Sequence, residues 1–167
     1  TQANKNFDVV LWTGNATYPR NITGLGFQPD FVWSKTRSNA YDHILYDVLR
    51  GTGGHALSSN NTDSEGLYGT NNNNLTSFNS DGFTLGATSS TDVMNGSGLT
   101  EVAWNWKANG TGVSNTDGSI TSTVSVNASA GFSVVTYTGT GSVATIGHGL
   151  GVKPSMIIFK VRSNGTY

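Results

Sequence analysis

Short runs in which hydrophobic and polar residues alternate recur along the whole chain. A period of two is typical of β-strands with one buried face, and each run has the length of a strand. The runs lie at 7–12, 30–35, 43–49, 82–86, 100–106, 119–126, 132–137 and 155–160. The segment 40–51 is the best helical candidate, but it is short, rich in β-branched residues and followed by glycine, so we expect a strand or a single turn there.

The run TEVAWNW at 100–106 has the clearest alternation in the chain. One face of this strand carries Val102, Trp104 and Trp106, and small or polar side chains alternate with them. We expect the face with the two tryptophans to point into the core. Trp12 and Trp33 also lie within predicted strands, so we interpret all four tryptophans as core residues rather than as a binding surface.

Asn-Gly and Asp-Gly pairs are spread between the predicted strands. They are Asp81-Gly82, Asn95-Gly96, Asn109-Gly110, Asp117-Gly118 and Asn164-Gly165. Such pairs favour the tight turns of β-hairpins, which join antiparallel strands. The pattern therefore predicts an all-β fold, an antiparallel, jelly-roll-like β-sandwich.

The chain also repeats itself. GLGFQPDFVWSKTRSN at 24–39 returns as GLGVKPSMIIFKVRSN at 149–164, an offset of 125 residues, and the match extends back without a gap to Phe7 and Phe132. Residues are identical at 13 of the 36 aligned positions from 7–42 and 132–167, so the two stretches are copies of one module. We assign 1–107 to a complete module, 108–130 to a linker or connecting hairpin, and 131–167 to an incomplete second copy.

The incomplete copy holds only the start of the module. Two strands are too few to bury a hydrophobic face, and unpaired strand edges recruit other chains. We therefore expect that the natural polypeptide continues past residue 167, or that a neighbouring subunit completes the half-module by strand addition or swapping.

Composition narrows the possible functions. Charged residues make up 11% of the chain and the net charge is −1, so the basic surplus that nucleic-acid binding requires is missing. No cysteine is present, which excludes disulfides and thiolate metal sites. No stretch approaches the apolar length of a membrane span. Gly, Thr, Ser and Asn together form about half the chain, a composition that resembles secreted or virion β-proteins.

Catalytic and cofactor motifs are weak. No G-x-S-x-G motif occurs, and His43, His55 and His148 stand in unrelated settings, which we interpret as turns or surface positions. The carboxylates sit mostly at turns or on polar strand faces. GTGGHA at 51–56 fits the dinucleotide-binding pattern formally, but no helix is predicted after it. We expect no enzyme activity, no cofactor and no metal site, although a calcium site built partly from backbone carbonyls stays open.

Sugar binding by a β-sandwich needs an exposed aromatic ring for stacking and a few amide or carboxylate partners. The candidates for such a glycan site are Tyr18, Tyr41, Tyr68, Asn72 and Asn73. The alternative is that these residues only decorate loops.

The order of motifs carries a resemblance over nearly the whole chain. LWTGN, ITGLGFQPDFVWSKTRSN, DHILYDVLRG, LTSFNSDGFTLG, VAWNWKANG and AGFSVVTYTGTGS together resemble a domain that recurs, often in tandem, in tail-fibre and other virion proteins of marine bacteriophages and cyanophages. Members of that family are similar to concanavalin-like or SPRY-like β-sandwiches. The resemblance implies a structural or adhesive module on a virion surface, and it supplies no catalytic residues.

On this basis we expect a tail-fibre, spike or capsid-decoration protein with an extracellular location. Its partners would be other virion proteins or copies of itself, and loops would contact host-surface glycans. The main alternative is a secreted bacterial carbohydrate-binding module, and the third is a polysaccharide-degrading enzyme.

Overall fold

A computed structural model describes residues 3–66, 74–86 and 92–163 of the chain. The first copy of the module contains short strands and two 3-10 turns. These are η1 (Ala3–Lys5), β1 (Phe7–Thr13), β2 (Arg20–Thr23), β3 (Phe31–Thr36), β4 (Ile44–Asp47), η2 (Gly53–His55), β5 (Leu57–Ser58), β6 (Leu75–Asn79), β7 (Gly82–Leu85) and β8 (Thr100–Trp106). The rest of the chain contributes β9 (Val113–Asn115), β10 (Ser122–Asn127) and β11 (Phe132–Tyr137).

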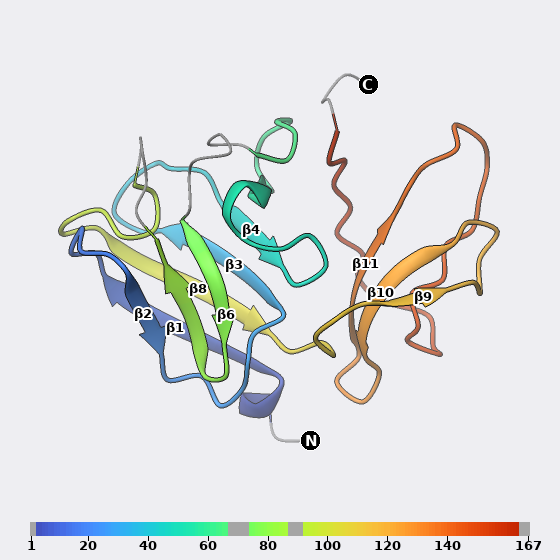
Figure 1. Cartoon of the computed structure of the whole chain (residues 1–167), viewed down its shortest axis with the longest axis horizontal. Helices are drawn as coiled ribbons and strands as arrows, with labels where there is room; N and C mark the ends of the chain where they lie inside the picture. Colours follow the sequence, from blue (N-terminus) through green and yellow to red (C-terminus); the bar gives the residue numbers. More distant parts are fainter. Residues whose placement is uncertain (1–2, 67–73, 87–91, 164–167) are drawn as a thin grey trace.

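Two antiparallel sheets pack face to face in the first copy (Figure 1). Sheet A has the strand order β1-β8-β3-β4-β5, and sheet B has the order β2-β7-β6. Within the named strands every pairing is antiparallel. The prediction of an all-β, antiparallel sandwich is therefore confirmed.

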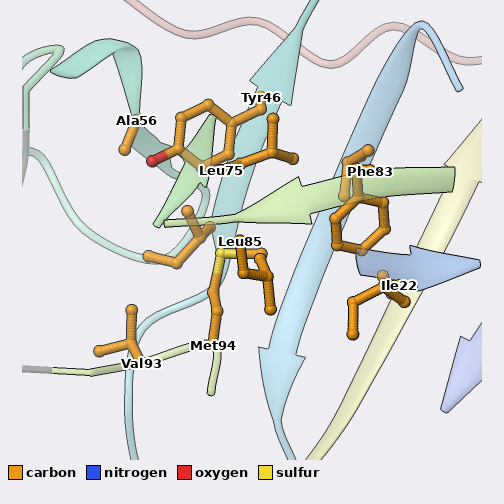
Figure 2. Packing of buried hydrophobic residues seen from close by; sticks show 11 residues of the cluster. Ile22, Tyr46, Ala56, Leu75, Phe83, Leu85, Val93 and Met94 are labelled. Carbon is orange, nitrogen blue, oxygen red and sulfur yellow. The ribbon is translucent and has the colours of Figure 1, made fainter. Parts of the chain in front are cut away.

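The hydrophobic core fills the space between the two sheets (Figure 2). Its buried members come from both sheets, from the end of η2 and from the loop before β8: Ile22, Val32, Ile44, Tyr46, Ala56, Leu75, Phe83, Leu85, Val93, Met94 and Ala103. Trp12 closes one side of this core, because its ring meets Phe83 edge-on with the centroids 5.9 Å apart, and its Nε1 donates to the Met94 carbonyl oxygen at 2.9 Å. Buried area of this kind is the main source of stability for the sandwich.

The β6–β7 hairpin shows how one sequence signal sets the geometry of sheet B. The hairpin turns at Ser80 and Asp81, and Gly82 begins β7, so the Asp81-Gly82 pair lies at a hairpin turn, as predicted. Gly82 has a φ of 158°, and a Cβ atom there would lie 1.9 Å from the Ile22 carbonyl oxygen. Only glycine therefore allows β2 to approach β7 closely enough to pair with it.

Strand β8 lies at the centre of sheet A, between β1 and β3, but its predicted orientation is wrong. The residues that face the sandwich interior are Glu101, Ala103 and Asn105, all fully buried. Trp104 and Trp106 are half-buried on the outer face of the sheet. The interior opposite β8 is already filled by large side chains such as Phe83 and Met94, so it has room for small or medium residues from β8.

The segment 40–51 forms β4 and a following turn, which confirms the expectation of a strand or single turn. A buried ion pair fixes this turn. Arg50 Nε donates to Asp47 Oδ2 at 2.5 Å, and the guanidinium also bonds the Leu45 carbonyl oxygen at 3.1 Å and Glu65 Oε1 at 3.2 Å. The Asp47 carboxylate and the Arg50 guanidinium are both buried, so each has lost its hydration. The ion pair between them compensates for the cost of that loss.

The segment 108–130 contains β9 and β10, which pair antiparallel with each other. Together with β11 these strands form a third sheet, sheet C, in the order β11-β10-β9. β11 is the counterpart of β1 in the repeat. The run at 155–160, the counterpart of β3, is extended but belongs to no strand, so the strand predicted there is not formed.

Candidate functional site

The outer face of sheet A carries a continuous group of apolar and aromatic side chains, which we call the aromatic face. Alternation along β1, β8, β3 and β4 places these residues together because the strands pair in register. The aromatic face consists of Phe7, Val9, Leu11, Phe31, Trp33, Leu45, Val102, Trp104 and Trp106. Val9 and Leu11 are 42% and 60% exposed, so part of this face is open to water.

Trp33 and Trp104 lie at the middle of the aromatic face, directly opposite each other in the β3–β8 register. Their rings meet edge-on with the centroids 6.2 Å apart. Trp33 Nε1 donates a hydrogen bond to His43 Nδ1 at 2.8 Å, and the two rings are also in edge contact at 5.8 Å. The polar edge of Trp33 is thus satisfied, while both indoles keep part of their apolar surface in solvent.

The protonation state of His43 follows from this geometry. Partial burial lowers the pKa of His43 below 6.5, and the charge of Lys35 lowers it further, while Asp42 has a smaller opposite effect. A neutral imidazole can accept the Trp33 hydrogen bond at Nδ1, whereas an imidazolium cannot. The hydrogen bond from Trp33 therefore requires the neutral form of His43.

The other end of the aromatic face is covered by the second copy. Trp106 contacts Phe7 and Phe31 with ring centroids at 4.8 Å and 5.4 Å. Phe132, the first residue of β11, stacks on Trp106 at 5.9 Å with an interplanar angle of 18°, and it lies 6.0 Å from Phe31. An aromatic cluster therefore joins the two copies of the module.

Hydrogen bonds support the same junction. The buried carboxylate of Asp30 accepts the backbone N–H of Ala108 at 2.8 Å and that of Gly110 at 3.3 Å, which fixes the exit from β8. Asn127 Nδ2 donates to Asn6 Oδ1 at 3.0 Å. Charge-assisted bonds to a buried carboxylate are among the stronger hydrogen bonds in proteins, so the connection between the copies is fixed in orientation.

A buried acid lies beneath the opposite, interior face of sheet A. Glu101 is fully buried, and neither carboxyl oxygen has a hydrogen-bond partner. Burial raises the pKa of Glu101 to about 7, and the charge of Asp92 adds to this effect, while the charge of Lys35 opposes it. The Thr36 hydroxyl directs its proton to the Val93 carbonyl oxygen at 2.8 Å. A carboxyl in this position is out of reach of a polysaccharide.

The residues predicted to bind glycans are only partly placed by the structure. Tyr18 and Tyr41 are half-buried and pack against the core cluster, and the Tyr18 hydroxyl donates to Asp92 Oδ2. Tyr68, Asn72 and Asn73 lie outside the described residues. Glycan contact by these five residues stays a prediction.

The histidines take separate places in the fold. His43 bonds Trp33, His55 is half-exposed beside Glu65, and His148 Nδ1 accepts the backbone N–H of Leu150 at 3.1 Å. Among the described residues, no group of three or more His, Cys, Asp or Glu could hold a metal ion. GTGGHA forms the 3-10 turn η2 and leads into β5 rather than into a helix.

Trp12 packs against the core, as the sequence predicts. The expectation of a core position is wrong for Trp33, Trp104 and Trp106, which lie on the outer face of sheet A. The signal that could have placed them lies in the neighbouring strands, because Phe7, Val9 and Leu11 alternate in β1 just as the apolar residues do in β8. When both faces of a sheet carry apolar residues, the alternation in one strand does not show which face points into the core.

No helix among the residues that the structure describes is long and apolar enough to cross a membrane. Neither the curated proteins nor the solved structures contain a match to the chain. One family model, Domain of unknown function (DUF7483), matches residues 2–167. The chain therefore belongs to the DUF7483 family.

Proposed function

We propose that this chain is a structural and adhesive module on the surface of a bacteriophage particle, such as a tail fibre, spike or capsid decoration. Its partners are other virion proteins or further copies of the module. The contact between the two copies is the observation that carries the proposal, because Phe132 stacks on Trp106 across the junction. A fibre or spike needs modules that follow one another at a fixed orientation, and a packed aromatic junction supplies this.

The order of motifs described above also supports the virion proposal, since it resembles that of modules found in tandem in phage tail-fibre proteins. Low charge and many small polar residues suit a protein that is exposed to solvent outside the cell.

Labelling of intact particles tests this proposal. Antibodies raised against the purified chain should decorate the surface of phage particles from the native source in electron micrographs. Secreted protein that never accompanies a particle would contradict the proposal and favour the secreted carbohydrate-binding module instead.

A second function, glycan adhesion, is favoured by the open part of the aromatic face. Trp33 and Trp104 present half-buried indole surface beside the exposed Val9 and Leu11. The C–H faces of sugar rings stack on such indole surfaces, and polar groups at the edge provide hydrogen bonds. His43 and Lys35 occupy the edge next to Trp33.

Glycan binding can be measured with immobilised host-surface polysaccharides. Trp104→Ala should weaken binding by about tenfold, which corresponds to about 1.4 kcal/mol. Val113→Ala is the control, because Val113 is 59% exposed on β9, which belongs to sheet C and not to sheet A. Equal binding by the wild type and Trp104→Ala, with both proteins folded, would contradict a role for this face.

A further inference from the structure

The open part of the aromatic face is organised in rows across sheet A, because β1, β8 and β3 pair in register. One row contains Val9, Trp104 and Trp33. In the next row, Lys35 lies opposite Val102. Residues two apart on a strand are about 6.6 Å from each other, so Lys35 begins one step from Trp33 along the same face. A positive charge therefore borders the indole surface.

Backbone oxygens hold the ammonium group of Lys35 in place. Lys35 Nζ donates to the carbonyl oxygen of Thr36, and it also donates to that of Asn39 at 3.0 Å. An ammonium group has three donors, so its contacts with the described residues leave one N–H for a ligand. A side chain that is ordered in advance loses less rotamer freedom on binding. The charge of Lys35 is thus fixed beside Trp33 before a ligand arrives.

No ion pair neutralises this ammonium group among the residues that the structure describes. Of the described acids near it, Glu101 is fully buried on the opposite face of sheet A. Asp42 accepts hydrogen bonds from Asn60 Nδ2 at 2.8 Å and Asn61 Nδ2 at 3.0 Å, so its oxygens are turned toward the loop after β5. Arg37, exposed directly after β3, adds a second positive charge. The open aromatic face therefore has a cationic end.

We propose that the open aromatic face selects anionic sugars, a refinement that rests on the glycan adhesion proposed above. A sugar ring stacks on Trp33 and Trp104, and a carboxylate or sulfate group on that ring accepts a hydrogen bond from the free N–H of Lys35. Hydrogen bonds between charged groups are shorter and stronger than neutral ones. The apolar row binds neutral and acidic sugars alike, whereas the Lys35 charge distinguishes them.

Matched pairs of oligosaccharides test this selection by isothermal titration calorimetry with the full chain. One pair is an alginate oligosaccharide and the same molecule with its carboxylates reduced to alcohols. The second pair is a carrageenan oligosaccharide and its desulfated form. We expect the anionic member of at least one pair to bind about tenfold more tightly than its neutral partner. Added salt should reduce this difference, because it screens the charge. The pair that shows the difference identifies carboxylate or sulfate as the anion.

Variants of the lysine separate its role from that of the overall charge. Lys35→Met keeps an unbranched side chain and removes the charge, so it should bind the anionic and neutral members equally. Lys35→Arg keeps the charge and should retain most of the preference for the anionic member. Lys153→Met is the matched control, because Lys153 is exposed in the second copy and lies outside sheet A. This control should bind as the wild type does.

The outcomes distinguish this inference from the glycan adhesion on which it rests. Equal affinity of the wild type for anionic and neutral members would overturn the selection of anionic sugars, and so would equal loss of the preference in Lys35→Met and Lys153→Met. In either case, binding of the neutral members that Trp104→Ala weakens would leave glycan adhesion in place. Absence of binding by every oligosaccharide would also overturn the inference, and retention of the chain on immobilised polysaccharides would then show whether glycan adhesion stands on its own.

Discussion

Replacement of Glu101 by glutamine tests the unusual interior of sheet A. Glu101 is fully buried without a hydrogen-bond partner for either oxygen, and burial raises the pKa of its carboxyl to about 7. Glutamine has nearly the same size and shape as the protonated acid, but it carries no ionisable proton. Glu101→Gln therefore leaves the packing intact and removes only the cost of holding a charge inside the core.

The size of the effect follows from the two pKa values. The carboxyl titrates near 4.5 in the unfolded chain and near 7 in the folded one. At about 1.4 kcal/mol for each pKa unit, this difference corresponds to about 3 kcal/mol of the free energy of unfolding. Because the folded pKa is the higher one, this stability is fully present below pH 4.5 and is lost as the pH rises through about 7.

Urea unfolding of both proteins at several pH values measures this loss. At about pH 4 the wild type and Glu101→Gln should be similar in stability, and at about pH 8 the variant should be more stable by about 3 kcal/mol. Asp63→Asn is a suitable control, because Asp63 is exposed and its replacement should change stability little at either pH.

All other ionisable groups are the same in the wild type and in Glu101→Gln. Their pH dependence therefore cancels when the two free energies of unfolding are subtracted. A difference between the wild type and Glu101→Gln that is the same at both pH values would refute the reasoning. A variant that is less stable than the wild type at high pH would show that the charged carboxylate has a partner.

Two further predictions concern ionisable groups elsewhere in the first copy. Asp47→Ala leaves the buried guanidinium of Arg50 without its main partner and should cost about 3–5 kcal/mol, which the midpoint of urea unfolding would report; an unchanged midpoint would contradict the buried pair. His43 has a lowered pKa, so its contribution to stability is present above pH 6.5 and is lost as the pH falls through the folded value. Protonation should also break the bond from Trp33 and change tryptophan fluorescence, a change that His43→Gln should abolish if the assignment is right.

The sequence predicted the strands of the first copy well where local signals were strong. Alternation located β1, β3, β7 and β8, and Asp81-Gly82 marked the turn that precedes β7. These features depend on neighbouring residues and on glycine conformations, which are properties of the local sequence.

Other elements had no local signal. The strands β2, β5, β6 and β9 were not predicted, because they are short, polar or interrupted. They are strands because partners with the right register lie beside them, which no single-sequence pattern reveals. The candidate glycan residues were likewise chosen by type alone, and Tyr18 and Tyr41 proved to pack against the core.

The sequence by itself determined that this protein is built from antiparallel strands and that the stretch 7–42 recurs without a gap at 132–167, since alternation, turn residues and the repeat can all be read along the chain. Only the tertiary structure decided which face of β8 is inside. That choice depends on the side chains that fill the space between the sheets, such as Phe83 and Met94, and these come from distant parts of the chain. The tertiary structure likewise decided that 155–160 is not a strand, because a strand needs a paired neighbour and the segment has none among the described residues.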